Sequence, residues 1–168
     1  SKDFVDLFDT ASKIPAYDSS QASFDAHFEL VYSMLNRYSK MLDIYNVYDD
    51  VVSLKQVNDS GVNNPIKVER ELIEIIDYGK KVYSLTDGRV NIAMGSVLSI
   101  WHSFREDGLK NPENASVPSE DMLKQAAQYT DIDSIAIDYD NNTVTLKNPN
   151  VSIDIGAIAK GFVCDKIA

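Results

Sequence analysis

The sequence predicts an α+β fold, in which helices and an antiparallel sheet occupy separate blocks of the chain. Apolar residues recur at helical spacing through most of the 168 residues, whereas strict alternation of apolar and polar residues is confined to the last third. The alternating segments flank a short polar turn, which indicates a hairpin and not a β-α-β crossover. With 44% hydrophobic residues, the chain is long enough to enclose one core.

The first half of the chain is predicted to hold two long helices. Residues 2–14 alternate loosely and are expected to form an edge strand. A helix follows from Ser23, because apolar residues recur there at steps of three and four. Its apolar face consists of Phe24, Phe28, Val31, Leu35, Tyr38 and Leu42. Residues 43–65 are polar and are expected to be irregular, and a second helix is predicted from Glu69 to Ser84.

The second half is predicted to begin with helices and end with strands. An apolar helix is expected from Met94 to Phe104, followed by a charged loop to Pro118. Ser119 is the predicted N-cap of a short helix that ends near Ala127. The hairpin strands are carried by Ile135 and Ile137, and by Val144 and Leu146.

The segment from Ser152 to Gly161, Ser-Ile-Asp-Ile-Gly-Ala-Ile-Ala-Lys-Gly, is the most informative part of the sequence. It predicts a third strand over Val151–Ile155 that passes through Gly156 into a helix. The free N–H groups and the positive end of such a helix favour a phosphate group, and a glycine lets the ligand approach the backbone. A nucleotide or pyrophosphate site between Asp154 and Lys160 is one interpretation.

The other interpretation of this segment is structural. Gly156 would then form a tight turn before a packing helix, with the Lys160 side chain in solvent. The pattern is not a Walker loop, because Phe162 and Val163 stand in place of the required Lys and Ser or Thr. It also lacks the middle glycine of a Rossmann fingerprint.

The charge and the cysteine content exclude several functions. The formal net charge of −10 argues against binding to nucleic acid or to an anionic membrane surface. A phosphate-bearing ligand must therefore be held by local donors or by a metal ion. Cys164 is the only cysteine, so an intrachain disulfide and a cysteine-rich metal site are both excluded. His102 lacks a carboxylate partner at a telling spacing and is expected to be structural or solvated.

Residues 154–162, followed by Asp165, resemble the signature D-[LI]-G-[AS]-I-A-K-G-[YF]-x-x-D of the ApbE family of FAD:protein FMN transferases. Residues 85–101 and 42–58 are similar to two further blocks of that family, and Phe8-Asp9-Thr10 lies where the family domain begins. The resemblance implies an ApbE-like, T-fold-related domain with an antiparallel sheet and packed helices. Residues 1–168 would be its N-terminal part, with the C-terminal part, which completes the metal site, absent from this apparently truncated chain.

The resemblance also implies a set of site residues, although it assigns no catalytic residue. The carbonyl of Ala157 would bind Mg²⁺, and Asp154 and Lys160 would contact the nucleotide of FAD. Tyr45 would stack on a flavin or adenine ring, the alternative being a half-buried surface tyrosine. Phe8 would cover the pocket. Ile92, Ala93 and Met94 would line it, the alternative for these three being core packing.

The implied activity is the Mg²⁺-dependent transfer of FMN from FAD to a threonine of an acceptor flavoprotein, with release of AMP. The 168 residues alone are expected to be inactive. Two alternatives stay open, a flavin-binding module without catalysis and a metal-dependent FAD pyrophosphatase. No nucleic-acid partner is expected. The family resemblance implies a lipoprotein on the outer face of the bacterial cytoplasmic membrane, held there only by an N-terminal lipid anchor that this sequence lacks.

Overall fold

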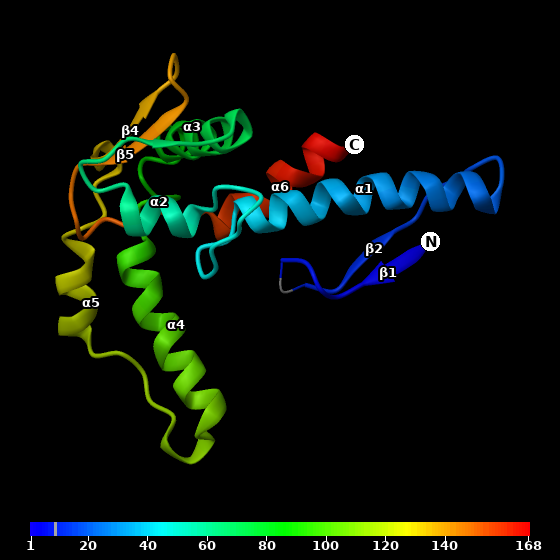
Figure 1. Cartoon of the computed structure of the whole chain (residues 1–168). Coiled ribbons are helices and arrows are strands. Elements are labelled where there is room, and N and C mark those ends of the chain that lie inside the picture. Colours follow the sequence, from blue (N-terminus) through cyan, green and yellow to red (C-terminus); the bar gives the residue numbers. More distant parts are fainter. Residues whose placement is uncertain (9) are drawn as a thin grey trace.

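The computed structural model describes residues 1–8 and 10–168, and this part of the chain combines helices with two small antiparallel sheets (Figure 1). The predicted α+β class is therefore confirmed. The three-stranded sheet lies with helix α3 at one end of the molecule, and the long helix α1 extends away from it. Among the described residues, no helix has the length and apolar character needed to cross a bilayer.

The N-terminal segment is a hairpin and not the single edge strand that was predicted. Strands β1 (Lys2–Phe4) and β2 (Ser12–Ile14) pair antiparallel. The ring of Phe4 packs edge-on against Tyr32 of α1 at 5.4 Å between centroids. Leu7, in the turn, is only 4% exposed and belongs to the main core. The hairpin is thus attached both to α1 and to the core.

Helix α1 (Gln21–Met41) begins two residues earlier than the predicted start at Ser23. The hydroxyl of Ser20 caps it by accepting a hydrogen bond from the N–H of Ser23. The predicted apolar face is largely confirmed, because its buried residues are Phe24, Phe28, Leu35, Tyr38 and Met41.

Helix α2 (Leu54–Ser60) lies in the segment that was predicted to be irregular. Ser53 and Gln56 form a capping box, in which each side chain bonds to the backbone of the other residue. Leu54 and Val57 are fully buried. These two apolar residues and the cap are enough to hold a helix of only seven residues against the core.

The three-stranded sheet has the order β3-β5-β4, with all neighbours antiparallel. Strands β4 (Ile135–Asp138) and β5 (Thr143–Leu146) form the predicted hairpin. The third strand is β3 (Ile66–Lys67), which sequence reasoning missed. The prediction of a third strand over Val151–Ile155 is wrong, because this segment belongs to no strand.

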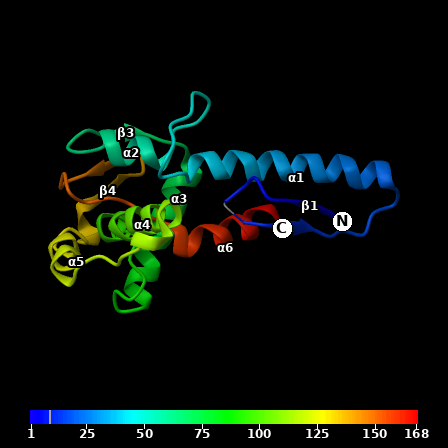
Figure 2. The same cartoon turned by 90° about the horizontal axis from the view of Figure 1, so that it is seen from below.

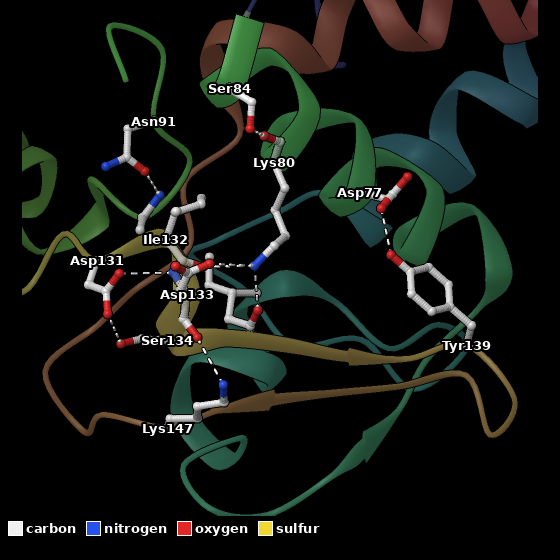
Figure 3. Close-up of polar contacts among 12 residues, drawn as sticks. Asp77, Lys80, Ser84, Asn91, Asp131, Ile132, Asp133, Ser134, Tyr139 and Lys147 are labelled. Carbon is white, nitrogen blue, oxygen red and sulfur yellow. Dashed lines mark hydrogen bonds and ion pairs between the residues drawn. The ribbon is translucent and has the colours of Figure 1, made fainter. Parts of the chain in front are cut away.

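Helix α3 (Arg70–Leu85) is linked to the start of β4 by the partly buried side chain of Lys80. The Lys80 ammonium donates to the carbonyls of Ile132 and Ile135, at 2.9 and 2.8 Å (Figure 3). Burial lowers the pKa of Lys80, and the nearby carboxylate of Asp133 opposes this shift. Lys147 donates to the carbonyl of Asp133 at 3.1 Å from the other side of the same turn, the 3₁₀ helix η2 (Ile132–Ser134).

Helices α4 (Gly95–Lys110) and α5 (Glu120–Ala127) project together from the rest of the molecule (Figure 1). Helix α4 continues six residues beyond the predicted end at Phe104, and a 3₁₀ helix, η1 (Pro112–Asn114), follows it. The prediction of a loop from Arg105 onward was therefore wrong for the first six of its residues. The predicted cap of α5 is confirmed, because the Ser119 hydroxyl accepts a hydrogen bond from the N–H of Met122.

Helix α6 (Gly156–Ile167) confirms the helix predicted at this glycine, and it packs against α1 and α3 (Figure 2). Ala159 and Val163 form its buried side. This packing places the first turn of α6 next to the C-terminal end of α1, where the candidate site lies.

Candidate functional site

A cavity of about 470 Å³ lies at the start of α6. It is bounded by the N-terminal turn, the end of α1, the loop that follows α1, and the first two turns of α6. The lining residues are Asp6, Phe8, Ser39, Leu42, Asp43, Ile44, Tyr45, Asn46, Tyr48, Asp154, Ile155, Gly156, Ala159 and Lys160. Its volume is within the range of small-molecule sites. Four predicted site residues thus meet here: Phe8, Tyr45, Asp154 and Lys160.

Segment 151–155 carries Asp154 to the cavity. Its odd-numbered residues, Val151, Ile153 and Ile155, are all buried. On one side, however, the hydrogen-bonding partner of this segment is a side chain and not another strand. The amide of Asn58 accepts from the N–H of Ile153 at 2.8 Å and donates to its carbonyl at 3.0 Å. Asn58 therefore takes the place of a neighbouring strand.

The opposite side of segment 151–155 is held by the loop that precedes α4. The N–H of Asp154 donates to the carbonyl of Ile92 at 2.8 Å, and the N–H of Gly95 donates to the carbonyl of Ser152 at 3.0 Å. A Cβ atom on Gly95 would lie only 2.6 Å from that carbonyl oxygen. This close approach requires glycine at position 95.

The other predicted pocket residues lie behind this segment and do not line the cavity. Ile92 and Ala93 are 1% and 0% exposed and belong to the core. Met94 is half-buried at the N-cap of α4. Of these three residues, Ile92 supports the backbone that carries Asp154, through its carbonyl.

The N–H groups at the start of α6, which the sequence predicted to be free, are largely bonded within the turn itself. The Asp154 carboxylate accepts a hydrogen bond from the N–H of Gly156 at 2.8 Å, which fixes the carboxylate at the start of the helix. Ala157 is exposed in the first turn and does not line the cavity. A helical carbonyl accepts one hydrogen bond from the residue four positions later and keeps a second lone pair. The Ala157 carbonyl can therefore still act as an oxygen ligand.

Lys160 is exposed on the second turn of α6, and its side chain lines the cavity. Its ammonium donates to the hydroxyl of Thr10 in the N-terminal turn. This contact differs from the structural interpretation of the segment, in which the Lys160 side chain lies only in solvent.

The loop after α1 is organised by the carboxylate of Asp43, a residue for which the sequence predicted no role in the site. Its carboxylate accepts from the N–H groups of Tyr45 and Asn46, at 2.6 and 3.2 Å, and from the Tyr48 hydroxyl at 2.6 Å. Burial alone would raise the pKa of Asp43, but these hydrogen bonds outweigh it and hold the pKa below its usual range. The hydrogen bond with Asp43 raises the pKa of the Tyr48 hydroxyl to about 12. Asp side chains often accept a hydrogen bond from the backbone N–H two residues later, as in an Asx-turn, and this tendency is the signal that could have identified the role of Asp43.

Tyr45 is half-exposed and stacks on His102 of α4. The ring centroids are 4.7 Å apart and the planes differ by 28°. The Tyr45 hydroxyl lies 3.3 Å from Nδ1 of His102, and a guanidinium nitrogen of Arg105 lies 3.1 Å from the same atom. His102 therefore supports a cavity residue from outside, which agrees with the prediction of a structural histidine.

Comparison with known proteins agrees with this geometry. The sequence model of the ApbE family matches residues 8–168. The FAD:protein FMN transferase of Treponema pallidum is 28% identical over 162 residues, which are 93% of this chain and 40% of the relative. That of Chlamydia pneumoniae is 28% identical over 130 residues, or 76% and 38% of the two chains. The chain thus spans about two fifths of the length of these curated relatives.

A solved structure supports the same assignment. The crystal structure of the ApbE protein from Thermotoga maritima matches with a TM-score of 0.70 at 28% identity, over 89% of this chain and 45% of that one. The match to the family model, residues 8–168, includes every residue that lines the cavity except Asp6. The chain belongs to the ApbE family.

Proposed function

We propose that this chain forms part of the FAD site of an FAD:protein FMN transferase. The observation that carries the proposal is the convergence of Phe8, Tyr45, Asp154 and Lys160 on one cavity at the start of α6. The two aromatic rings can contact a flavin or adenine ring, and the Lys160 ammonium suits a phosphate. The relatives named above carry this activity in their names.

The charges around the cavity support a divalent cation as part of the proposal. Three carboxylates, from Asp6, Asp43 and Asp154, line the cavity together with a single described cation, Lys160. A pyrophosphate would be repelled by this surface, and by the net charge of −10, unless a metal ion compensated its charge.

The oxygen donors beside the cavity fit a Mg²⁺ ion that is bound jointly by the protein and by the phosphates of the substrate. Mg²⁺ is usually held by one or two carboxylates together with substrate phosphates and water. The Asp154 carboxylate and the Ala157 carbonyl are hard donors of this kind. Within residues 1–8 and 10–168, no group of three or more acidic, histidine or cysteine side chains could hold the ion by itself. When bound, Mg²⁺ would neutralise charge on the pyrophosphate.

The proposed reaction is an attack by a threonine hydroxyl of an acceptor flavoprotein on the FMN-side phosphorus of FAD. The bond from that phosphorus to the bridging oxygen breaks, AMP leaves, and the threonine proton is released. The residues described above bind and orient the dinucleotide, so their contribution is positioning and charge compensation. A location at the outer face of the cytoplasmic membrane stays a prediction.

The test is incubation of the complete gene product with FAD, Mg²⁺ and an acceptor fragment, followed by mass spectrometry. We expect an FMN adduct on the fragment and an equivalent amount of AMP. An acceptor in which valine replaces the modifiable threonine should give no adduct. Release of FMN and AMP without an adduct would contradict the transferase and favour the pyrophosphatase.

Binding to the 168-residue chain provides a second, independent measurement. Calorimetric titration with FAD in the presence of Mg²⁺ should give a dissociation constant that Lys160→Met weakens by about tenfold, because a charge-assisted contact is lost. The control is Lys124→Met, since Lys124 pairs with Glu120 on the exposed surface of α5. Equal effects of the two substitutions would contradict the assignment of the cavity.

A further inference from the structure

Lys160 and Thr10 are 150 residues apart in the sequence, and their contact joins α6 to the N-terminal turn. A lysine ammonium has three N–H donors, and among the described residues its hydrogen bond to Thr10 is the one that Lys160 makes. The partner is a neutral hydroxyl. It can therefore hold the ammonium in place without cancelling its charge, which remains available to an anionic ligand.

The Thr10 hydroxyl can act only as an acceptor toward Lys160. Its single hydrogen is donated to the carbonyl of Phe8, at 2.9 Å between the oxygens. The remaining lone pairs are thereby directed toward the lysine. The N–H of Thr10 also donates to the carbonyl of Leu7 at 3.3 Å, and Leu7 is buried in the core. The hydroxyl is thus held on an anchored turn.

Phe8 is the second cavity residue that Thr10 holds. Its backbone has a φ of 55°, in the left-handed region that bulky residues rarely adopt. The hydrogen bond from the Thr10 hydroxyl to the Phe8 carbonyl stabilises this turn, and the Phe8 side chain lines the cavity. The bond is made to the backbone of Phe8 and not to its ring, so the ligand-binding group that the hydroxyl contacts directly is the Lys160 ammonium.

We propose that Thr10 is a positioning residue for the phosphate groups of the bound dinucleotide, acting by fixing the Lys160 ammonium at the cavity. This inference rests on the proposed function, because it needs FAD as the ligand. Thr10 would make no necessary contact with FAD itself. Its hydroxyl would restrict the long lysine side chain before binding, so that less side-chain entropy is lost when the phosphate arrives.

The test compares Thr10→Val, which removes the hydroxyl at nearly constant shape, with Thr10→Ser, which keeps it. Calorimetric titrations with FAD and with riboflavin, which has no phosphate, are carried out on each variant. We expect Thr10→Val to weaken FAD binding by about fivefold to tenfold and to leave riboflavin binding unchanged. Thr10→Ser should bind FAD as the unmodified chain does.

A double-mutant cycle with Lys160→Met separates positioning from a purely structural contact. Once the ammonium is removed, Thr10→Val should have no further effect on FAD binding. The matched control is Thr130→Val, because the Thr130 hydroxyl also donates to a backbone carbonyl, that of Ala127, away from the cavity. Thermal unfolding of every variant checks that the fold is retained.

The outcomes distinguish this proposal from the proposed function. If the unmodified chain binds FAD and Thr10→Val binds it equally well, the positioning role is overturned and the FAD site stands. Equal weakening of FAD and riboflavin, or additive effects in the cycle, also overturns it, since both indicate a general loss of structure. If the unmodified chain does not bind FAD at all, both proposals are overturned together.

Discussion

Asn58 has a structural role that a single side chain rarely fills, because it satisfies both backbone groups of Ile153. Ile153 is fully buried, so water cannot replace these bonds. A buried polar group that loses its partner keeps the full penalty of desolvation. The position of Asp154, the next residue, therefore depends on an amide from α2.

Substitution of Asn58 by leucine tests this dependence. Leucine has a similar shape but no hydrogen-bonding group, so the N–H and carbonyl of Ile153 would be left without partners. We expect the free energy of unfolding to fall by about 2–4 kcal/mol, as measured by urea denaturation. Asn64→Leu is the control, because the exposed Asn64 side chain donates one hydrogen bond among the described residues, to the carbonyl of Ser60, and its loss should cost less than about 1 kcal/mol. Similar losses for both variants would contradict the role given to Asn58.

The carboxylate of Asp43 gives the cavity loop a pH dependence with a defined sign. Its pKa in the folded chain is lower than its ordinary value of 3.8, because hydrogen bonds outweigh burial. A lowered pKa contributes stability above the ordinary pKa, and this contribution is lost as pH falls through the folded value. We expect the stability difference between the unmodified chain and Asp43→Asn to shrink when the pH is lowered from about 6 to about 3.

The measurement is urea denaturation of both proteins across this pH range. Asp107→Asn is the control, because Asp107 is exposed on α4 and its side chain makes no ion pair or hydrogen bond with the described residues. A difference for Asp43→Asn that stays constant with pH would show that the carboxylate is not ionised in its hydrogen-bonded form.

At the scale of elements, two glycines next to the candidate site are under opposite constraints. A Cβ on Gly95 would meet the backbone of Ser152 at 2.6 Å, whereas a Cβ on Gly161 would have nothing within 4 Å. Gly161 also lies inside α6, where glycine is a poor helix former. The same substitution should therefore have opposite effects at the two positions.

We expect Gly95→Ala to destabilise the chain by about 1–3 kcal/mol, because a backbone contact must open. It should also weaken FAD binding, since the contact holds the segment that carries Asp154. Gly161→Ala should stabilise the chain by about 0.5–1 kcal/mol. Urea denaturation measures both changes. Destabilisation by Gly161→Ala would show that this face of α6 is not open in the folded protein.

The long helices and the hairpin could be predicted from the sequence because their signals are local. The apolar face of α1 and the alternation in β4 and β5 depend on spacing within one segment. Helix α2 was missed because it buries only two residues, although the Ser53–Gln56 capping box was a readable signal. The end of α4 was missed because its last turns are largely exposed and charged, so they show no apolar period.

The partner of segment 151–155 could not be read from the sequence. A strand was predicted over Val151–Ile155, but an asparagine side chain takes the place of the neighbouring strand. The same limit applies to the site. The signature around Asp154 and Lys160 located one wall of the cavity, and the resemblance added Phe8 and Tyr45. The contacts of Asp43 and Thr10 depend on loop geometry and on residues far apart in the chain, which no local pattern encodes.

At the scale of the whole molecule, the charge of the chain opposes the ligand proposed for it. The net charge is −10, and three carboxylates line the cavity. FAD is an anion, so long-range repulsion should slow its approach, whereas the local contact with Lys160 acts only at short range. Salt screens the long-range part first, because the Debye length falls from about 30 Å at 0.01 M to about 10 Å at 0.1 M.

We therefore predict that, without Mg²⁺, the association rate constant of FAD rises as ionic strength increases from about 0.01 to about 0.1 M. Stopped-flow measurement of flavin fluorescence gives this rate, and neutral riboflavin is the control, whose rate should hardly change. Mg²⁺ should reduce the salt effect on FAD, because it compensates charge on the pyrophosphate before or during binding. A steep fall of the FAD rate with salt would instead indicate attraction by a basic surface, which this chain does not present among its described residues, and would contradict the proposed entry of FAD at an acidic cavity.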